Sequence, residues 1–318
     1  MASALGLGRR RSVEEPFDVG VAIDGNTASP LASPHTREQQ RQRETSVLQA
    51  LEYASVHLAP ITATPQLEAE VLLSHVRGCS RAALLAHPER ELSPQEWKRY
   101  QDWVQKRATG YPLPYITRRV EFYDLEFDVS PEVLIPRPET EMLVDLALRR
   151  HPQTVVDVGT GSGCIAVTLA VHLPQALVYA FDISPQALAV AQQNAERHGV
   201  AERVIVMASD VLTTRPNPVD LVVSNPPYIP SAHCAGLPIS VQYEPPLALD
   251  GGPDGLDIIR RLLSQAPAVL QPGGSLLVEI GADQGATVRE LAQAAFPTAA
   301  VRIHPDMAGL DRVLEVQT

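Results

Sequence analysis

The pattern of apolar and polar positions is helical from residue 45 to residue 110, where three helices are predicted. On the first, the apolar side chains that share one face are Val47, Leu51, Ala54 and Leu58. The second is predicted to begin at Thr64, as N-cap, with Pro65 in its first turn, and to end at Gly78.

The third predicted helix begins at Ser93, which forms a capping box with Glu96. Its apolar face continues with Trp97, Tyr100 and Val104. We interpret this aromatic stripe as the core of a small helical bundle rather than as a ligand platform, because core helices show the same spacing.

Residues 119–129 alternate between apolar and polar side chains on either side of Tyr123-Asp124, which predicts a β-hairpin that links two domains. Beyond it, strand and helix patterns alternate. Strands are predicted at 154–157, 178–182, 204–207, 221–224 and 275–280 and near Val301 and Val313, and helices after the first two strands, after Gly255 and through Leu291. This alternation predicts a mostly parallel sheet with helices on both faces. The last two strands, with no helix between them, predict an antiparallel hairpin at the sheet edge.

Length and composition favour a folded protein of two domains, since the chain has 318 residues, of which 45% are apolar and 20% charged. Residues 1–44 lack a periodic apolar pattern and are rich in Ser, Pro, Gly, Arg and Gln, so we expect a disordered extension. No membrane span or secretory signal is recognised. The three cysteines, Cys79, Cys164 and Cys234, form no C-x-x-C pair, which fits a reducing compartment.

Charge is unevenly distributed along the chain. Residues 120–318 hold eleven arginines and no lysine against 24 acidic residues. A surface of this sign repels a phosphate backbone. We therefore expect a protein or small-molecule partner rather than duplex DNA or RNA.

A glycine-rich turn follows the first predicted strand of the sheet. It consists of Gly159, Thr160, Gly161, Ser162 and Gly163. Such a turn suits NAD, FAD or S-adenosylmethionine, or no ligand at all. Asp182, at the end of the next strand, can accept hydrogen bonds from both hydroxyls of a ribose; helix capping is the alternative, but Ser184 fills that role. Ser209-Asp210-Val211 follows the third strand, where the base of a cofactor is expected.

The segment Asn225-Pro226-Pro227-Tyr228 follows the strand at 221–224. Because ligands of open α/β sheets bind beyond the carboxyl ends of the strands, it should face the same crevice as the glycine-rich turn. The prolines lack N–H donors, which leaves the Asn225 side-chain oxygen and the Pro226 carbonyl as acceptors beside the Tyr228 ring. This arrangement suits a planar NH₂ group aimed at an electrophilic methyl. A rigid turn without function would explain the prolines but neither the asparagine nor the tyrosine.

Together these motifs resemble the class I S-adenosylmethionine-dependent amino methyltransferases. The segments 134–141 (Leu-Ile-Pro-Arg-Pro-Glu-Thr-Glu) and 244–252 (Glu-Pro to Gly-Gly) resemble more narrowly the HemK/PrmC family, which methylates the glutamine of the Gly-Gly-Gln motif in peptide chain release factors. The resemblance covers residues 45–318. It implies an α/β fold, a Rossmann-like doubly wound sheet with a terminal antiparallel hairpin, plus a small N-terminal helical domain. Arg118 departs from the family pattern, which usually has Gly there.

The resemblance also implies the cofactor, S-adenosyl-L-methionine, and no metal. The implied cofactor-binding residues are Gly159, Thr160, Gly161, Ser162, Gly163, Asp182, Asp210, Val211 and Asn225. The implied substrate-binding residues are Asn225, Pro226, Pro227 and Tyr228, of which Asn225, Pro226 and Tyr228 are the catalytic ones. The implied reaction is a direct displacement, in which the glutamine nitrogen attacks the methyl carbon in line with the departing sulfur. The two acceptors bind the NH₂ group more strongly as it gains positive charge, and the tyrosine ring stacks on the amide. No histidine lies in these motifs, so no general base is assigned.

The expected organisation is a disordered extension at 1–44, a helical substrate-recognition domain at 45–118, a hairpin linker at 119–130 and a methyltransferase domain at 131–318. We expect a cytoplasmic monomer that acts on a release factor. The alternatives are a ribosomal-protein glutamine methyltransferase, an N6-adenine nucleic-acid methyltransferase, a dehydrogenase and a non-catalytic cofactor-binding scaffold. The acidic charge counts against the nucleic-acid enzyme, and the Asn-Pro-Pro-Tyr segment has no use in hydride transfer.

Overall fold

The first part of the chain forms a helical bundle in the computed structural model, which describes residues 45–214 and 218–318. Its main helices are α2 (Val47–Leu58), α3 (Pro65–Arg77) and α5 (Pro94–Ala108), with the shorter α4 (Arg81–Leu85) and α6 (Leu113–Thr117). Two short strands, β1 (Thr45–Ser46) and β2 (Glu91–Leu92), pair antiparallel. The disorder predicted for 1–44 lies outside the described residues.

The apolar faces predicted for the bundle are confirmed. All four α2 positions are buried, as are Tyr100 and Val104, and Trp97 packs on the same core while half-buried. The capping box at Ser93 is present, and Gly78 ends α3 in the left-handed conformation, with φ of 63°. Thr64 is the N-cap of α3 and Pro65 its first residue, as predicted, although the Thr64 side chain forms no capping hydrogen bond.

The second part of the chain forms a seven-stranded sheet in the order β10-β11-β9-β8-β5-β6-β7. The parallel strands are β5 (Thr154–Val158), β6 (Leu177–Asp182), β7 (Val204–Ala208), β8 (Val219–Ser224) and β9 (Leu270–Glu279). The last strands, β10 (Ala300–Pro305) and β11 (Asp311–Gln317), are antiparallel, with β10 at the edge. The predicted sheet and its terminal hairpin are confirmed.

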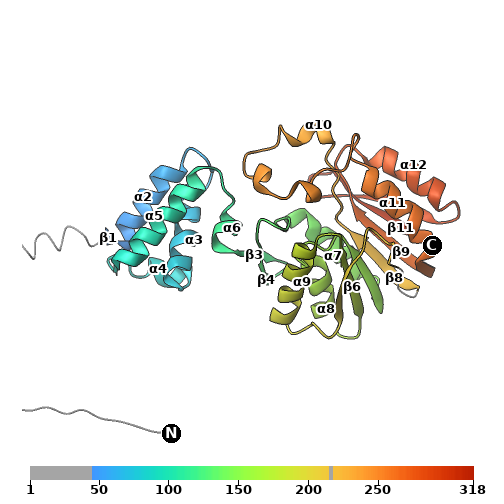
Figure 1. Cartoon of the computed structure of the whole chain (residues 1–318), viewed down its shortest axis with the longest axis horizontal. Coiled ribbons are helices and arrows are strands. Elements are labelled where there is room, and N and C mark those ends of the chain that lie inside the picture. The colour runs from blue at the N-terminus through green and yellow to red at the C-terminus, as the bar shows by residue number, and fades with distance from the viewer. Residues whose placement is uncertain (1–44, 215–217) are drawn as a thin grey trace, which may run out of the picture. The chain divides into compact units, whose positions relative to one another are not determined.

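Helices cover both faces of this sheet (Figure 1). One face packs on α7 (Glu141–Leu148), α8 (Cys164–His172) and α9 (Pro185–Arg197), the other on α11 (Asp257–Gln265) and α12 (Gly285–Ala295). Val155 belongs to the first apolar core and its neighbour Val156 to the second, because successive side chains of a strand point to opposite faces. This is why the strands are apolar at nearly every position.

Short helical segments complete the fold: α10 (Ser231–Cys234), η1 (Pro138–Thr140), η2 (Val241–Tyr243), η3 (Pro246–Ala248) and η4 (Ala266–Ala268). Of the helices in the described part of the chain, none has the length and apolarity that a bilayer crossing requires.

The predicted hairpin is formed by β3 (Arg119–Phe122) and β4 (Leu125–Asp128). Tyr123 and Asp124 connect them with φ of 52° and 60°, as a two-residue hairpin turn requires. Phe122 and Phe127 are buried in the same apolar core as α7 and α8. The hairpin therefore packs as part of the sheet domain.

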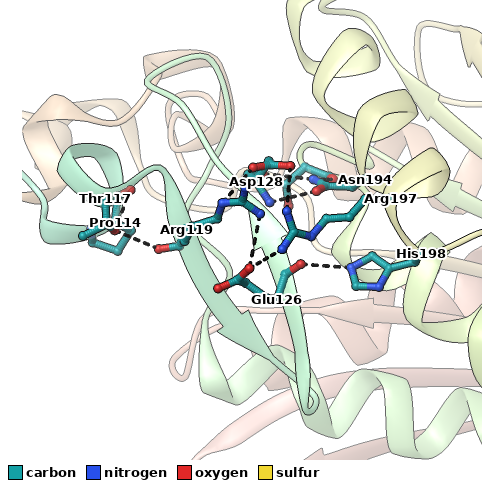
Figure 2. Close-up of polar contacts among 9 residues, drawn as sticks. Pro114, Thr117, Arg119, Glu126, Asp128, Asn194, Arg197 and His198 are labelled. Carbon is teal, nitrogen blue, oxygen red and sulfur yellow. Dashed lines mark hydrogen bonds and ion pairs between the residues drawn. The ribbon is translucent and has the colours of Figure 1, made fainter. Parts of the chain in front are cut away.

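Polar contacts also attach β4 to α9 (Figure 2). Asn194 exchanges two hydrogen bonds with the Asp128 backbone, at 2.8 and 2.9 Å, and His198 contacts the Glu126 carbonyl at 2.9 Å. Arg197 pairs with Glu126. A third Asn194 hydrogen bond, to the carbonyl of Ser162 at 2.8 Å, connects the same buried amide to the glycine-rich turn.

Candidate active site

Two cavities, each of about 350 Å³, adjoin at the carboxyl ends of the parallel strands. The strand order reverses between β5 and β8, which is where open α/β sheets bind ligands. Both cavities are lined by Leu134, Asn225, Pro226 and Ala248. The dipeptide Asn225-Pro226 thus lies at the junction of the two cavities.

The glycine-rich turn lines the first cavity, as predicted. A Cβ atom at Gly159, where φ is 71°, would have no neighbour within 4 Å, so a ligand has room to approach the backbone there. At Gly163 a Cβ would lie 3.1 Å from the Cα of Ala191 in α9. Gly163 therefore serves the packing of two helices, a role that the sequence pattern did not indicate.

Asp182 also lines the first cavity, but its carboxylate has structural partners as well. It accepts hydrogen bonds from the Gly161 and Ser184 N–H groups, both at 2.9 Å. The Ser184 hydroxyl caps α9 at the Ala187 N–H, as predicted, and Asp182 in turn binds the N–H of this capping residue. Each carboxylate oxygen keeps acceptor capacity, so two ribose hydroxyls can still be bound.

Asp157, within the glycine-rich motif, was not predicted as a site residue. It is fully buried at the end of β5, where Oδ2 accepts hydrogen bonds from the Thr160 hydroxyl at 2.7 Å and from the Ala166 N–H at 3.2 Å. Its Oδ1 has no hydrogen-bond partner in the described part of the chain. Burial, and to a lesser degree the charge of Asp182, raise the pKa of Asp157 to about 7. The signal in the sequence is a lone carboxylate inside an apolar strand.

Two of the predicted cofactor-binding residues in the turn, Thr160 and Ser162, form hydrogen bonds within the protein. The Thr160 hydroxyl is occupied by Asp157, and the Thr160 N–H donates to the Phe181 carbonyl at 2.8 Å. Ser162 is buried, and its carbonyl accepts from Asn194. Both residues line the first cavity, and their contacts with a cofactor stay a prediction.

Asp210 and Val211 line the first cavity beyond β7. The Asp210 carboxylate forms an ion pair with Arg261 at 2.7 Å. Val211 has φ of 58°, a conformation that β-branched residues rarely adopt and that concentrates at functional sites. Ile183, next to Asp182, is 54% exposed and presents an apolar face to the same cavity.

The Asn225 amide is held by two residues that the sequence reasoning did not assign. Its Nδ2 donates to Thr140 Oγ1 at 3.0 Å, and Thr140 donates to Glu279 Oε2 at 2.7 Å. The Tyr228 hydroxyl donates to the other oxygen of Glu279 at 3.4 Å. In the described part of the chain nothing donates to Asn225 Oδ1 or to the Pro226 carbonyl, so both remain acceptors. Glu279 ends β9 beside β8, and the rule that led to Asn225 would also have found it.

The two segments quoted for the resemblance meet at the second cavity. Arg137 forms an ion pair with the buried Glu244, which also accepts a hydrogen bond from the Ile135 N–H at 3.0 Å. Arg137 and Tyr228 line this cavity with Pro226. Tyr228 faces the second cavity, whereas the glycine-rich turn belongs to the first.

Two protein-family models match the chain. Residues 49–117 match the PrmC N-terminal domain, and residues 137–235 match the methyltransferase small domain.

Curated relatives match over most of their length. A release factor glutamine methyltransferase of Moorella thermoacetica is 50% identical over 78% of this chain and 89% of the relative. One of Koribacter versatilis is 43% identical over 84% of this chain and 96% of the relative. Among solved structures, the hMettl16 catalytic domain in complex with the MAT2A 3'UTR hairpin 6 has a TM-score of 0.50 at 16% identity, covering 72% of this chain and 84% of that one. This last similarity concerns the fold alone.

Proposed function

The chain belongs to the release factor glutamine methyltransferase family, and from this premise we propose that it methylates the glutamine side-chain amide in the Gly-Gly-Gln motif of peptide chain release factors. The methyl donor is S-adenosyl-L-methionine. The observation that carries the proposal is the place of Asn225-Pro226 at the junction of two cavities. A donor in the first cavity and a glutamine side chain in the second would meet beside these acceptors.

The first cavity fits the donor in shape and charge. S-adenosyl-L-methionine carries a ribose, a planar base and two cationic groups, and when bound it supplies an electrophilic methyl group. Asp182 would hold the ribose, while Ile183 and Val211 would contact the base. The unpartnered oxygen of buried Asp157 provides negative charge beside the glycine-rich turn, where a cation would compensate it.

The residues at the junction can bind and orient a primary amide. Asn225 Oδ1 and the Pro226 carbonyl are acceptors for the two hydrogens of the NH₂ group, which would aim the nitrogen lone pair at the first cavity. These hydrogen bonds strengthen as the nitrogen gains positive charge, so they favour the transition state over the bound substrate. The Tyr228 ring supports the amide from the second cavity, with its hydroxyl held by Glu279.

We extend the proposal to the organisation of the chain. Residues 45–118 would recognise the protein substrate, 119–130 would link the domains and 131–318 would catalyse transfer; the ranges of the two family models support this division. The acidic charge of residues 120–318 supports a protein substrate over a nucleic acid. A monomer is supported because one chain supplies the lining of both cavities, and a cytoplasmic location follows from the proposed substrate.

The test is methylation of a purified release factor by the full-length chain with methyl-labelled S-adenosyl-L-methionine, followed by peptide mass mapping. The expected result is one methyl group on the glutamine of the Gly-Gly-Gln loop, absent when that glutamine is replaced by alanine. Methylation at another residue would contradict the proposed substrate. Tight cofactor binding without transfer to release factors or ribosomal proteins would indicate a scaffold.

A further inference from the structure

We propose that Glu279 is a positioning residue that acts through Thr140 to fix the orientation of the Asn225 amide, so that the amide oxygen faces the substrate nitrogen. The inference rests on the proposed function. It concerns two buried residues, Thr140 beside the first cavity and Glu279 beside the second, and it assigns them control over whether the site accepts an amide or a carboxylate.

The three side chains form one continuous chain of hydrogen bonds. Asn225 Nδ2 lies 3.0 Å from Thr140 Oγ1, and Thr140 Oγ1 lies 2.7 Å from Glu279 Oε2. Thr140 is 2% exposed and Glu279 1%, so water does not compete for these contacts. Thr140 lies in η1, Glu279 at the end of β9 and Asn225 directly after β8. The pairing of β8 with β9 fixes the positions of the last two.

The direction of the hydrogen bonds follows from the number of hydrogens available. The Thr140 hydroxyl donates to Glu279 Oε2, and a threonine hydroxyl has a single hydrogen. Thr140 therefore gives its hydrogen to Glu279 and offers Asn225 only a lone pair. The Asn225 atom that faces Thr140 must be the NH₂ group, because the flipped amide would place two acceptors 3.0 Å apart in a buried site.

Two hydroxyl groups and an arginine lie around the Glu279 carboxylate and partly offset the effect of burial on its pKa, which stays raised overall. Burial raises the pKa of Glu279, but the Thr140 hydrogen bond, the charge of Arg312 and the Tyr228 hydrogen bond oppose this rise. The two hydroxyls donate to different oxygens of the carboxylate. Both carboxylate oxygens are thus acceptors, and neither is left to donate to Thr140.

The consequence is selectivity between two side chains of nearly equal shape. With Oδ1 directed to the substrate, Asn225 attracts the NH₂ group of glutamine and repels the carboxylate of glutamate. If the Asn225 amide could rotate by half a turn, its NH₂ group would donate to a glutamate carboxylate, and the site would bind glutamate as readily as glutamine. Substitution of a residue with only a structural role would change the affinities for glutamine and for glutamate by the same factor.

The experiment compares Glu279→Gln, Thr140→Val and Thr140→Ser with the parental chain. Glutamine at 279 can donate to Thr140 and valine at 140 offers no acceptor, so both changes remove the constraint on Asn225, whereas serine retains it. Thr168→Val is the matched control, since the buried Thr168 hydroxyl in α8 has no partner in the described residues. The probes are a release factor and its Gly-Gly-Glu variant, with binding measured by competition and methylation by label transfer.

We expect Glu279→Gln and Thr140→Val to lower kcat/KM for the Gly-Gly-Gln protein by about 10- to 100-fold and to abolish its binding preference over the Gly-Gly-Glu protein. Affinity for S-adenosyl-L-methionine, measured by calorimetry, should stay within about twofold of the parental value. Thr140→Ser and Thr168→Val should retain the parental preference.

The outcomes separate this inference from the function on which it rests. A parental chain that does not methylate the Gly-Gly-Gln protein overturns the proposed function. An active parental chain whose Glu279→Gln and Thr140→Val variants keep the binding preference overturns the positioning role. Equal loss of affinity for both proteins also overturns it. If Glu279→Gln does not fold, the comparison of valine with serine at 140 decides.

Discussion

Asp157 makes a quantitative prediction possible, because its carboxylate is fully buried and has one oxygen without a partner. A rise in pKa from 3.8 to about 7 means that ionising this group costs about 4 kcal/mol more in the folded chain than in the unfolded chain. Asp157→Asn removes that cost, since the amide is neutral at every pH. The substitution should therefore stabilise the cofactor-free protein most at alkaline pH.

The sign and the pH range follow from proton linkage. The folded chain binds a proton at Asp157 that the unfolded chain has already released, so this contribution to stability is complete below about pH 4 and is lost as the pH rises through about 7. The two pKa values give a cost of about 2 kcal/mol at pH 5 and about 4 kcal/mol at pH 8. The free energy of unfolding of Asp157→Asn, relative to that of the parental chain, should thus be about 2.5 kcal/mol larger at pH 8 than at pH 5.

The measurement is urea unfolding of both proteins at pH 5 and pH 8 without cofactor. The difference between the two proteins reports on Asp157 and its hydrogen bonds, because the other titratable groups are present in both. Thr160→Val, which removes a hydrogen bond to the ionised carboxylate, should steepen the loss of stability with pH. An equal difference at both pH values would refute the reasoning. Saturating S-adenosyl-L-methionine should raise the Tm of the parental chain more than that of Asp157→Asn, because a cation compensates only the charged residue.

Three other substitutions test separate parts of the site and the fold. Asn225→Ala removes one acceptor for the substrate amide, so turnover at saturating cofactor should fall about 100- to 1,000-fold; a parental rate would exclude the proposed role. Asp182→Ala should weaken cofactor binding by about 1.5–3 kcal/mol in calorimetry and also lower the Tm, since the Gly161 and Ser184 N–H groups lose their acceptor; unchanged affinity would remove Asp182 from the site. Arg118→Gly should raise the unfolding free energy by about 0.5–1 kcal/mol, because Arg118 has φ of 60° at the end of α6; a lower Tm would show that its side chain compensates for this strain.

The strands and helices of the sheet domain could be predicted because each is recorded locally in the chain. Val155 and Val156 are both apolar because each faces a different layer of helices, and Ser184 caps α9 at the predicted position. The place of Asn225 could be predicted for the same reason. The motif follows a strand, and the carboxyl ends of parallel strands share one edge.

The contacts that hold Asn225 could not be predicted in this way. Thr140 lies 85 positions before Asn225, and Glu279 lies 139 positions after Thr140. No local pattern links them, because their contact depends on how η1 packs against β8 and β9. The same limit applies to Gly163, whose role depends on the close approach of Ala191. Sequence patterns locate residues on elements, whereas partners across elements are set by packing.

The carboxylates at the carboxyl edge of this sheet have different roles on different strands. Asp182 ends β6 and lines the first cavity, Asp157 is buried one residue before the end of β5, and Glu279 ends β9 beside the second cavity. The two aspartates favour a cation, while Glu279 acts through Thr140 and directs the neutral Asn225 oxygen toward the substrate. A carboxylate in direct contact with the substrate amide would also bind its NH₂ group. However, such a carboxylate would retain the positively charged methylated amide after transfer, and its burial would carry a large desolvation cost. Because Thr140 separates Glu279 from Asn225, the junction has a neutral acceptor, the Asn225 oxygen, and the carboxylate does not contact the substrate amide.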